Sequence, residues 1–105
     1  MKPEYILCAA IWYKDIPIKK EIPHNVLPVN CDKGLVFCGY RHTHCMYTMV
    51  SVTGLRSVET EVGEHIQGFL TSKNRFVDRE EGAAIHTANG HKIDFENRLF
   101  SEDLY

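Results

Sequence analysis

The sequence has no excess of positive charge, and its longest apolar run is short. The formal net charge is −2, whereas a general binder of nucleic acid or of a membrane surface needs an excess of basic residues. The longest apolar run, residues 6–13, falls far short of the roughly 20 residues that a membrane span needs. We therefore expect neither a nucleic acid polymer nor a membrane among the partners.

Several processing and catalytic signals are also missing. No N-terminal stretch combines basic residues, an apolar run and a small-residue cleavage site, so we expect a cytosolic protein whose four cysteines are reduced thiols. The sequence lacks a Walker loop, a G-x-G-x-x-G fingerprint and a G-x-S-x-G elbow. It also has no internal repeat. A chain of 105 residues, 44% of them apolar, is large enough for one modest core, which predicts a single domain over residues 1–105.

The apolar segments predict an α+β fold, with a small antiparallel or mixed sheet and about two helices packed on it. Residues 5–13 are continuously apolar and rich in aromatic and β-branched types, which predicts a central strand covered on both faces. Residues 34–40 predict a second buried strand. Arg41 to Thr43 then mark a junction from strand to helix, because Met46, Tyr47, Met49 and Val50 have helical spacing.

The remaining segments predict less regular structure. Three prolines predict a long loop over residues 14–33, with room for a short edge strand. Residues 51–54 should end the first helix, and residues 55–63 should be irregular or weakly helical. Because Leu99, Phe100, Leu104 and Tyr105 are too apolar for a free tail, we expect the C-terminal segment to dock against the body or against a neighbouring subunit.

The stretch from Gly68 to Gly90 organises the prediction. It indicates a strand, a tight turn at Ser72–Asn74, a short second strand and a helix. Asp78 has the features of an N-cap, and Glu81 is placed to complete a capping box. Asn89 and Gly90 supply the C-terminal stop.

Two arginines lie where this unit turns. Arg79 occupies the first helical turn, where the positive end of the helix dipole favours an anion, and Arg75 comes just before the cap. Guanidinium groups and helix N-termini both bind phosphate oxygens, so the pair predicts an anion site. On a helical wheel, Ala84, Ile85 and Ala88 form the apolar stripe. The opposite face, available to a ligand or a second subunit, comprises Arg79, Gly82, Ala83 and His86.

Other constellations fit known chemistry less well. Cys38, His42, His44 and Cys45 are zinc-type ligands, but they crowd across one strand end instead of forming two separated pairs. No cysteine hydrolase signature surrounds Cys45, which could pair with His42 or His44. Residues 79–82 faintly suggest a diphosphate hydrolase metal box, but its other parts are missing. We therefore predict no metal, no cofactor and no catalytic residue, and we favour a binder over an enzyme.

Four segments carry a resemblance to a known family: CAAIWY at residues 8–13, CGYRHTHC at 38–45, GFLTSKNRFVDREEGAAIH at 68–86 and LFSEDLY at 99–105. Together they resemble the Thoeris anti-defence proteins of the first type, a family of small phage-encoded proteins. NRFVDREE is the most specific piece, and CGYRH is the next. Two positions depart from the family pattern, Gly82 in place of alanine and Asn89-Gly90-His91 in place of A-G-Q.

The resemblance implies a sponge in the cytoplasm of an infected bacterium. Such proteins bind a cyclic ADP-ribose isomer without cleaving it, and some members hold cyclic di- or trinucleotides at a separate site. The family forms dimers with the pocket between subunits, and some members form hexamers built from dimers. Arg75 and Arg79 match the R-F-V-x-R pattern, so the resemblance implies that they hold the ligand phosphates.

The expected ligand-binding residues extend beyond these two arginines. An adenine calls for an aromatic surface, which Phe76, Trp12 or Tyr13 could provide. Asn74 lies in the same turn as the arginines, and a strand-to-helix junction is a frequent ligand site in mixed folds. We therefore predict a site made of Arg75, Arg79, Phe76, Asn74, Arg41, His42 and Trp12.

Two other functions stay open. One is a small hydrolase or transferase that acts on a nucleotide. The other is a non-catalytic inhibitor that binds a host protein through the aromatic C-terminal segment.

Overall fold

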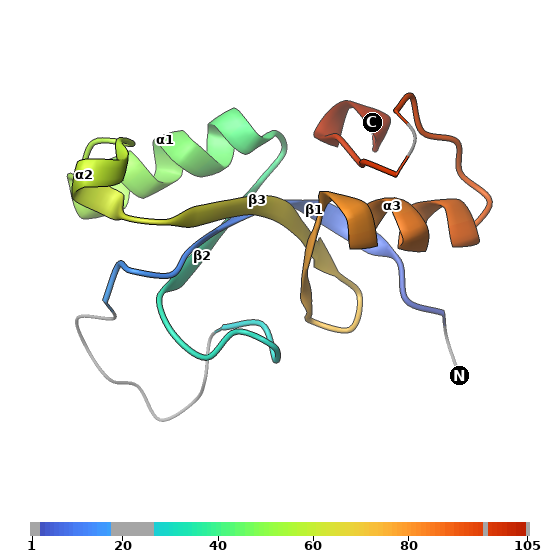
Figure 1. The fold of residues 1–105 in the computed structure, drawn as a ribbon, viewed down its shortest axis with the longest axis horizontal. Coiled ribbons are helices and arrows are strands. Elements are labelled where there is room, and N and C mark those ends of the chain that lie inside the picture. Colours follow the sequence, from blue (N-terminus) through green and yellow to red (C-terminus); the bar gives the residue numbers. More distant parts are fainter. Residues whose placement is uncertain (1–2, 18–26, 96, 105) are drawn as a thin grey trace.

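The structure is a computed structural model that describes residues 3–17, 27–95 and 97–104. Four strands form one antiparallel sheet in the order β2-β1-β3-β4 (Figure 1). The predicted α+β class is confirmed. In chain order the elements are β1 (Ile6–Tyr13), β2 (Leu35–Gly39), α1 (His42–Thr53), α2 (Glu59–Val62), β3 (His65–Thr71), β4 (Phe76–Asp78), α3 (Arg79–Ala88) and the 3-10 helix η1 (Ser101–Asp103).

β1 lies inside the sheet and is covered on both faces, as its apolar run predicts. Successive side chains of a strand point to opposite faces. Ile11 and Tyr13 are fully buried in a cluster that includes Met49 of α1. On the other face, Ala10 packs in a cluster with Phe76 and residues of the segment 27–31.

The helices cover one face of the sheet, and the segment 27–33 lies against the other (Figure 1). A third cluster lies beneath α3 and brings the C-terminal segment into the core; its buried members are Phe69, Val77, Ala83 and Leu99. Leu99 is fully buried and Leu104 packs against the same cluster. The expected docking of the C-terminal segment is thus confirmed for these residues, and Tyr105 lies outside the described part.

β2 forms where a buried strand was predicted, but it is an edge strand. Among the described residues it pairs only with β1, in a continuous register from Tyr13 opposite Leu35 to Ala9 opposite Gly39. Its residues are half-buried, and Cys38 is exposed. The prediction of a buried strand is therefore wrong, because the composition of this segment does not reveal that a second neighbour is missing.

The unit from β3 to α3 matches the prediction closely. Asn74 adopts a left-handed conformation in the turn, with φ of 56°. Asp78 is the N-cap of α3, and its Oδ1 accepts a hydrogen bond from the Glu81 N–H at 2.9 Å. The Glu81 side chain does not complete the capping box. Its carboxylate instead lies 3.4 Å from Arg75 Nη1. At the other end, Asn89 caps the helix and Gly90 follows with φ of 87°.

The predicted faces of α3 are largely reversed, although Ile85 of the predicted apolar stripe is half-buried and packs against the core. Gly82, Ala83 and His86 are its buried residues, whereas Ala84 and Ala88 are exposed. The helix approaches the sheet closely because position 82 has no side chain: a Cβ there would lie 3.1 Å from Phe69 and 3.3 Å from Leu99. The face of α3 that packs on the sheet is therefore the one that lets the helix backbone come close to Phe69 and Leu99, and not the one with the most hydrophobic side chains.

The other segments are only partly as predicted. α1 continues through residues 51–53, where a break was expected, and ends at Gly54, which has φ of 74°. The stretch expected to be irregular or weakly helical contains the short helix α2, in agreement with the second alternative. The described parts of the proline-rich loop contain no strand, and residues 18–26 lie outside the description. Among the described helices, none combines the length and the apolar composition needed to span a bilayer.

Candidate functional site

Two helix N-termini point toward the same region of the molecule. α1 begins at His42, directly after β2, and α3 begins at Arg79, directly after β4. Figure 1 shows these two ends facing each other above the middle of the sheet, with the C-terminal segment beside them. A cavity of about 260 Å³ lies here, and its lining residues are Arg41, His42, Thr43, Arg79, Phe100, Ser101 and Glu102. Because helix N-termini favour negative charge, the location suits an anion.

Arg79 is half-buried in this region and uses neutral acceptors. Its Nη2 donates to Gln67 Oε1 at 2.7 Å, and its Nη1 donates to the Leu99 carbonyl at 2.9 Å. The guanidinium carbon lies 4.4 Å from the centre of the Phe100 ring. None of the ion pairs within the described residues involves Arg79. A partly buried positive charge therefore lies at the cavity without a carboxylate bonded to it.

Burial is the main cause that lowers the pKa of Arg79, and the nearby Arg98 adds to it. The guanidinium still remains charged at physiological pH, since arginine does not lose its proton in proteins. The positive charge of Arg98 would also favour a bound anion, whereas the carboxylate of Glu102, which lines the same cavity, has the opposite effect. Arg79 and Arg98 also line a second cavity of about 360 Å³, together with Gln67 and Asp78 among others.

Arg41 reaches the cavity from the other side. Its Nη1 donates a short hydrogen bond to the Ser101 carbonyl, and its guanidinium carbon lies 4.5 Å from the Tyr40 ring centre. The Arg41 backbone holds the start of α1: its carbonyl accepts from His44 N at 3.0 Å, and its N–H donates to His44 Nδ1 at 3.1 Å. The structure thus brings the guanidinium groups of Arg41 and Arg79 to one cavity.

His42 lines the same cavity but is held by β3. Its Nε2 lies 2.8 Å from the Gly68 carbonyl, which requires that this nitrogen carry the proton. The ring packs edge-on against Phe69, with ring centres 5.3 Å apart. Burial lowers the pKa of His42, so the ring is neutral near pH 7 and anchors α1 to the sheet.

The two buried histidines predict that the protein loses stability in mild acid. Burial lowers the pKa of His42 and of His86, and for His86 the stacked ring of His91 adds to the effect. Below the unfolded value of about 6.5, the unfolded chain binds more protons than the folded protein, so the free energy of unfolding decreases as pH falls. The Glu4 carboxyl, whose pKa is lowered to about 2, keeps its charge in mild acid and therefore does not contribute to this loss of stability.

Urea unfolding at about pH 7.5 and about pH 5 measures this effect, and the midpoint is expected to be lower at the acidic pH. The double variant His42→Gln, His86→Gln should show a weaker dependence on pH. Equal or greater stability of the unmodified protein at the acidic pH would contradict the prediction.

Arg75 lies apart from this cavity, paired with Glu4. Its Nε and Nη2 donate to the two Glu4 carboxylate oxygens at 2.8 and 2.9 Å, and Thr71 Oγ1 donates to Glu4 Oε2 at 2.6 Å. The hydrogen bond from Arg75 is the largest cause that lowers the pKa of Glu4, and Glu4 in turn raises the pKa of Arg75. Ligand binding by Arg75 stays a prediction, and it would require this pair to open.

The other predicted residues are also elsewhere. Asn74 is exposed in the hairpin turn. Trp12 and Phe76 meet edge-on in the core on the opposite face of the sheet, with ring centres 5.8 Å apart, and Trp12 Nε1 donates to the Lys33 carbonyl at 2.8 Å. The aromatic ring at the arginine cavity is Phe100, which the sequence analysis did not select. The sequence signals for Phe100 were its place among the apolar residues of the C-terminal segment and in the matching segment LFSEDLY.

The cysteines and histidines do not gather at one point. Cys45 Sγ donates to the Ala9 carbonyl at 3.6 Å, while His44 is bonded to the Arg41 N–H. The thiol of Cys38 on the neighbouring strand lowers the pKa of Cys8 to about 7. Within the described ranges, no group of three or more His, Cys, Asp or Glu side chains could hold a metal ion.

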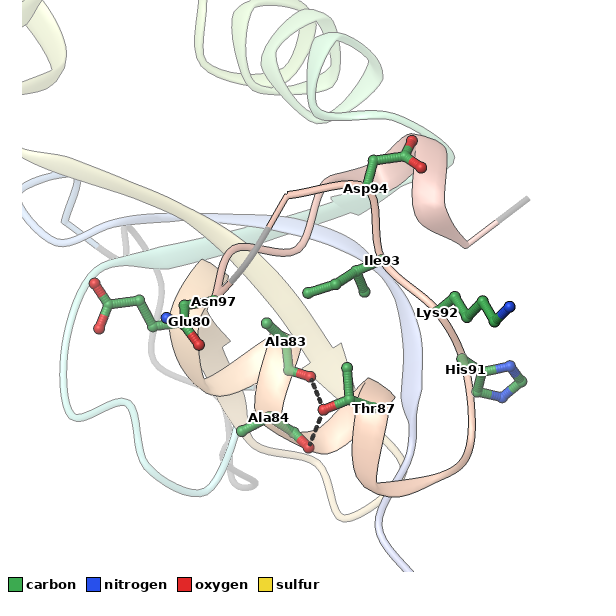
Figure 2. Close-up of a pocket in the computed structure, with 9 residues that line it drawn as sticks. All are labelled: Glu80, Ala83, Ala84, Thr87, His91, Lys92, Ile93, Asp94 and Asn97. Carbon is green, nitrogen blue, oxygen red and sulfur yellow. Dashed lines mark hydrogen bonds between the residues drawn. The ribbon is translucent and has the colours of Figure 1, made fainter.

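A larger cavity, about 610 Å³, lies between α3 and residues 91–97. Figure 2 shows Ile93 extending over Ala83, whereas His91, Lys92 and Asp94 point away from the helix. Thr87 Oγ1 bonds the carbonyl oxygens of its own helix at 2.8 and 3.2 Å. Charged groups do not converge here, so the smaller arginine cavity is the better candidate site.

The sequence was compared with known proteins. Residues 5–105 match the family described as Phage T4 y16D protein. Neither the curated proteins nor the solved structures yield a match. Because the family match extends over nearly all of the sequence, the chain belongs to the Phage T4 y16D protein family.

Proposed function

We propose that the protein binds a cyclic ADP-ribose-type signalling nucleotide at the cavity of Arg41 and Arg79 and sequesters it without cleaving it. It would act in the cytoplasm of an infected bacterium and block the activation of a Thoeris effector. The observation that carries the proposal is the Arg79 guanidinium, which is half-buried, donates to neutral acceptors within the described residues, and lines one cavity with the first residues of α1. A pyrophosphate oxygen is a stronger acceptor for such a group than a peptide carbonyl is.

The surroundings of Arg79 also suit the rest of such a ligand. Phe100 offers an aromatic ring next to the guanidinium, and an adenine stacks on rings of this kind. Arg79 lines both the cavity of about 260 Å³ and the cavity of about 360 Å³. Small-molecule sites commonly occupy about 300–1,000 Å³, so a ligand that contacts Arg79 and fills both cavities fits this range.

The proposal of binding without cleavage rests on the hydrogen bond that already occupies the histidine at this cavity. Hydrolysis needs a general base or a nucleophile held close to the reacting atom. His42, the histidine at this cavity, has its Nε2 committed to the Gly68 carbonyl. The resemblance further suggests a homo-oligomer and a separate site for cyclic oligonucleotides, and both are part of the proposal.

A binding and recovery experiment tests this function. The protein is titrated with a cyclic ADP-ribose isomer by calorimetry, with a dissociation constant expected below about 1 μM, because a sponge must hold a scarce signal. The complex is then denatured by heat, and the released compound is identified by mass spectrometry. Recovery of the intact isomer is expected.

Two other outcomes would replace the proposal. Recovery of ADP-ribose would indicate a hydrolase, and the proposed function would then be wrong. Absence of any binding would favour the inhibitor that acts through its C-terminal segment, and removal of Leu104 and Tyr105 should then abolish activity.

A further inference from the structure

An adenine that binds beside Arg79 needs an open aromatic face, and Phe100 supplies only part of one. Phe100 is half-buried, and the Arg79 guanidinium already lies over its ring, 4.4 Å from the ring centre. Phe76 and Trp12, which the sequence suggested for this role, contact each other on the opposite face of the sheet. Tyr13, the third suggested ring, is fully buried. The base therefore calls for a further ring.

Phe95 is a large aromatic side chain that lies exposed next to Phe100. Its exposed fraction is 61%, and its ring meets the Phe100 ring edge-on, with centres 5.1 Å apart and an angle of 62° between the planes. An edge-on contact uses the edge of one ring and a face of the other. Whichever ring contributes the edge, at least one face of Phe95 stays open. Within the described residues, no cation lies over this ring.

Tyr40 is another exposed ring near the cavity, but its surface is already occupied. Its exposed fraction is 54%, yet the Arg41 guanidinium carbon lies 4.5 Å from its ring centre. The His44 ring also packs against it, with centres 6.0 Å apart. These contacts belong to the start of α1, so Phe95 is the better candidate for a ligand.

The backbone ties Phe95 to residues of both cavities that Arg79 lines. The Phe95 carbonyl accepts a hydrogen bond from the Arg98 N–H at 3.3 Å, and the two residues form an isolated antiparallel bridge. The next residue, Leu99, donates its N–H to the Arg79 carbonyl at 2.9 Å and accepts from Arg79 Nη1 at 2.9 Å. Arg98 lines the larger of these two cavities and Phe100 the smaller. A backbone fixed to the first residue of α3 thus holds Phe95 beside the site.

We propose that the exposed ring of Phe95 stacks on the adenine of the nucleotide whose pyrophosphate Arg79 binds. This role for Phe95 rests on the proposed function, and it places the base at the outer end of the pair formed by Phe95 and Phe100. An exposed phenylalanine ring forgoes hydrophobic stabilisation, which a bound base would restore by covering it. Stacking needs a π face and no particular hydrogen bonds, so the site should accept other aromatic bases in place of adenine.

Calorimetric titration with a cyclic ADP-ribose isomer tests this role. Phe95→Leu keeps an apolar side chain against Phe100 but removes the π face, so the affinity should fall by about 5-fold to 150-fold, the range for loss of one base stack. Phe95→Trp restores a face and should bind within about threefold of the unmodified protein. Tyr47→Leu is the matched control and should leave the affinity unchanged, because Tyr47 is 69% exposed on α1 and lines neither cavity.

Nuclear Overhauser effects give a second measure that does not depend on affinity. In the saturated complex, the carbon-bound protons of the adenine should show contacts to phenylalanine ring protons. The saturated complex of Phe95→Leu should show much weaker contacts, whereas that of Tyr47→Leu should show the same contacts as the unmodified protein.

The possible outcomes separate this role from the proposed function. If the unmodified protein binds the isomer and Phe95→Leu binds it equally well, the role of Phe95 is wrong and the proposed function stands. Equal losses in Phe95→Leu and Phe95→Trp would also overturn the role, because the aromatic face would then not matter. A change in the solution mass of Phe95→Leu would overturn it too, since the ring would then belong to a contact between copies. If the unmodified protein binds no isomer, both proposals fail.

Discussion

Arg79→Gln is expected to weaken binding of a cyclic ADP-ribose isomer by about 100-fold, because a charge-assisted bond to phosphate in a partly buried site contributes on the order of 3 kcal/mol. Glutamine can still donate to the Leu99 carbonyl, but it lacks the charge and the two parallel N–H groups. Arg79→Lys keeps the charge and loses the fork, so its affinity should lie between the two. Calorimetry measures all three proteins.

Two further variants make this result specific. Lys73→Gln removes a charge from the exposed hairpin turn and should leave the affinity unchanged. Arg75→Gln breaks the pair with Glu4, so we expect lower stability with unchanged affinity. A loss of affinity in Arg75→Gln equal to that in Arg79→Gln would instead show that both arginines hold the ligand, as the family resemblance implies. An Arg79→Gln protein that binds normally would remove the basis of the proposed site.

Leu99→Ala is expected to lower the free energy of unfolding by about 2–5 kcal/mol, the range seen when a buried leucine leaves a cavity. Leu99 is fully buried, with an exposed fraction of 0%. It packs with Phe69, Val77 and Ala83 beneath α3. It also anchors the segment whose carbonyls bind Arg41 and Arg79. Urea unfolding followed by circular dichroism measures the change.

Val52→Ala is the matched control for this substitution. Val52 is 69% exposed on α1, and exposed substitutions usually change stability by less than about 0.5 kcal/mol. If Leu99→Ala costs no more than this control does, then the docked C-terminal segment contributes little to the fold.

Local signals predicted the unit from β3 to α3 well. The turn at Asn74, the Asp78 cap and the stop at Asn89 and Gly90 each depend on residues a few positions apart. Caps and turns are formed by such neighbours, so the sequence contains the required information. The central position of β1 was predictable for a similar reason, because an eight-residue apolar strand needs cover on both faces.

Contacts between distant residues were not predictable in this way. The partner of Arg75 is Glu4, 71 positions away, and Arg79 bonds the Leu99 carbonyl 20 positions away. A helical wheel also could not foresee that Gly82 would turn inward, because it ranks side chains by polarity and not by how closely the backbone can approach. Sequence reasoning therefore found Arg41, His42 and Arg79 individually, without showing that they meet at Phe100.

The order in which the ribosome makes these parts has a consequence for the nascent protein. Arg41 and Arg79 leave the ribosome before Leu99 and Ser101, whose carbonyls position them. Until those residues leave the exit tunnel, the two guanidinium groups have no such restraint and Phe100 is absent from the cavity wall. Competence to capture a ligand at this cavity would thus be acquired only after synthesis of the C-terminal segment, in one late step.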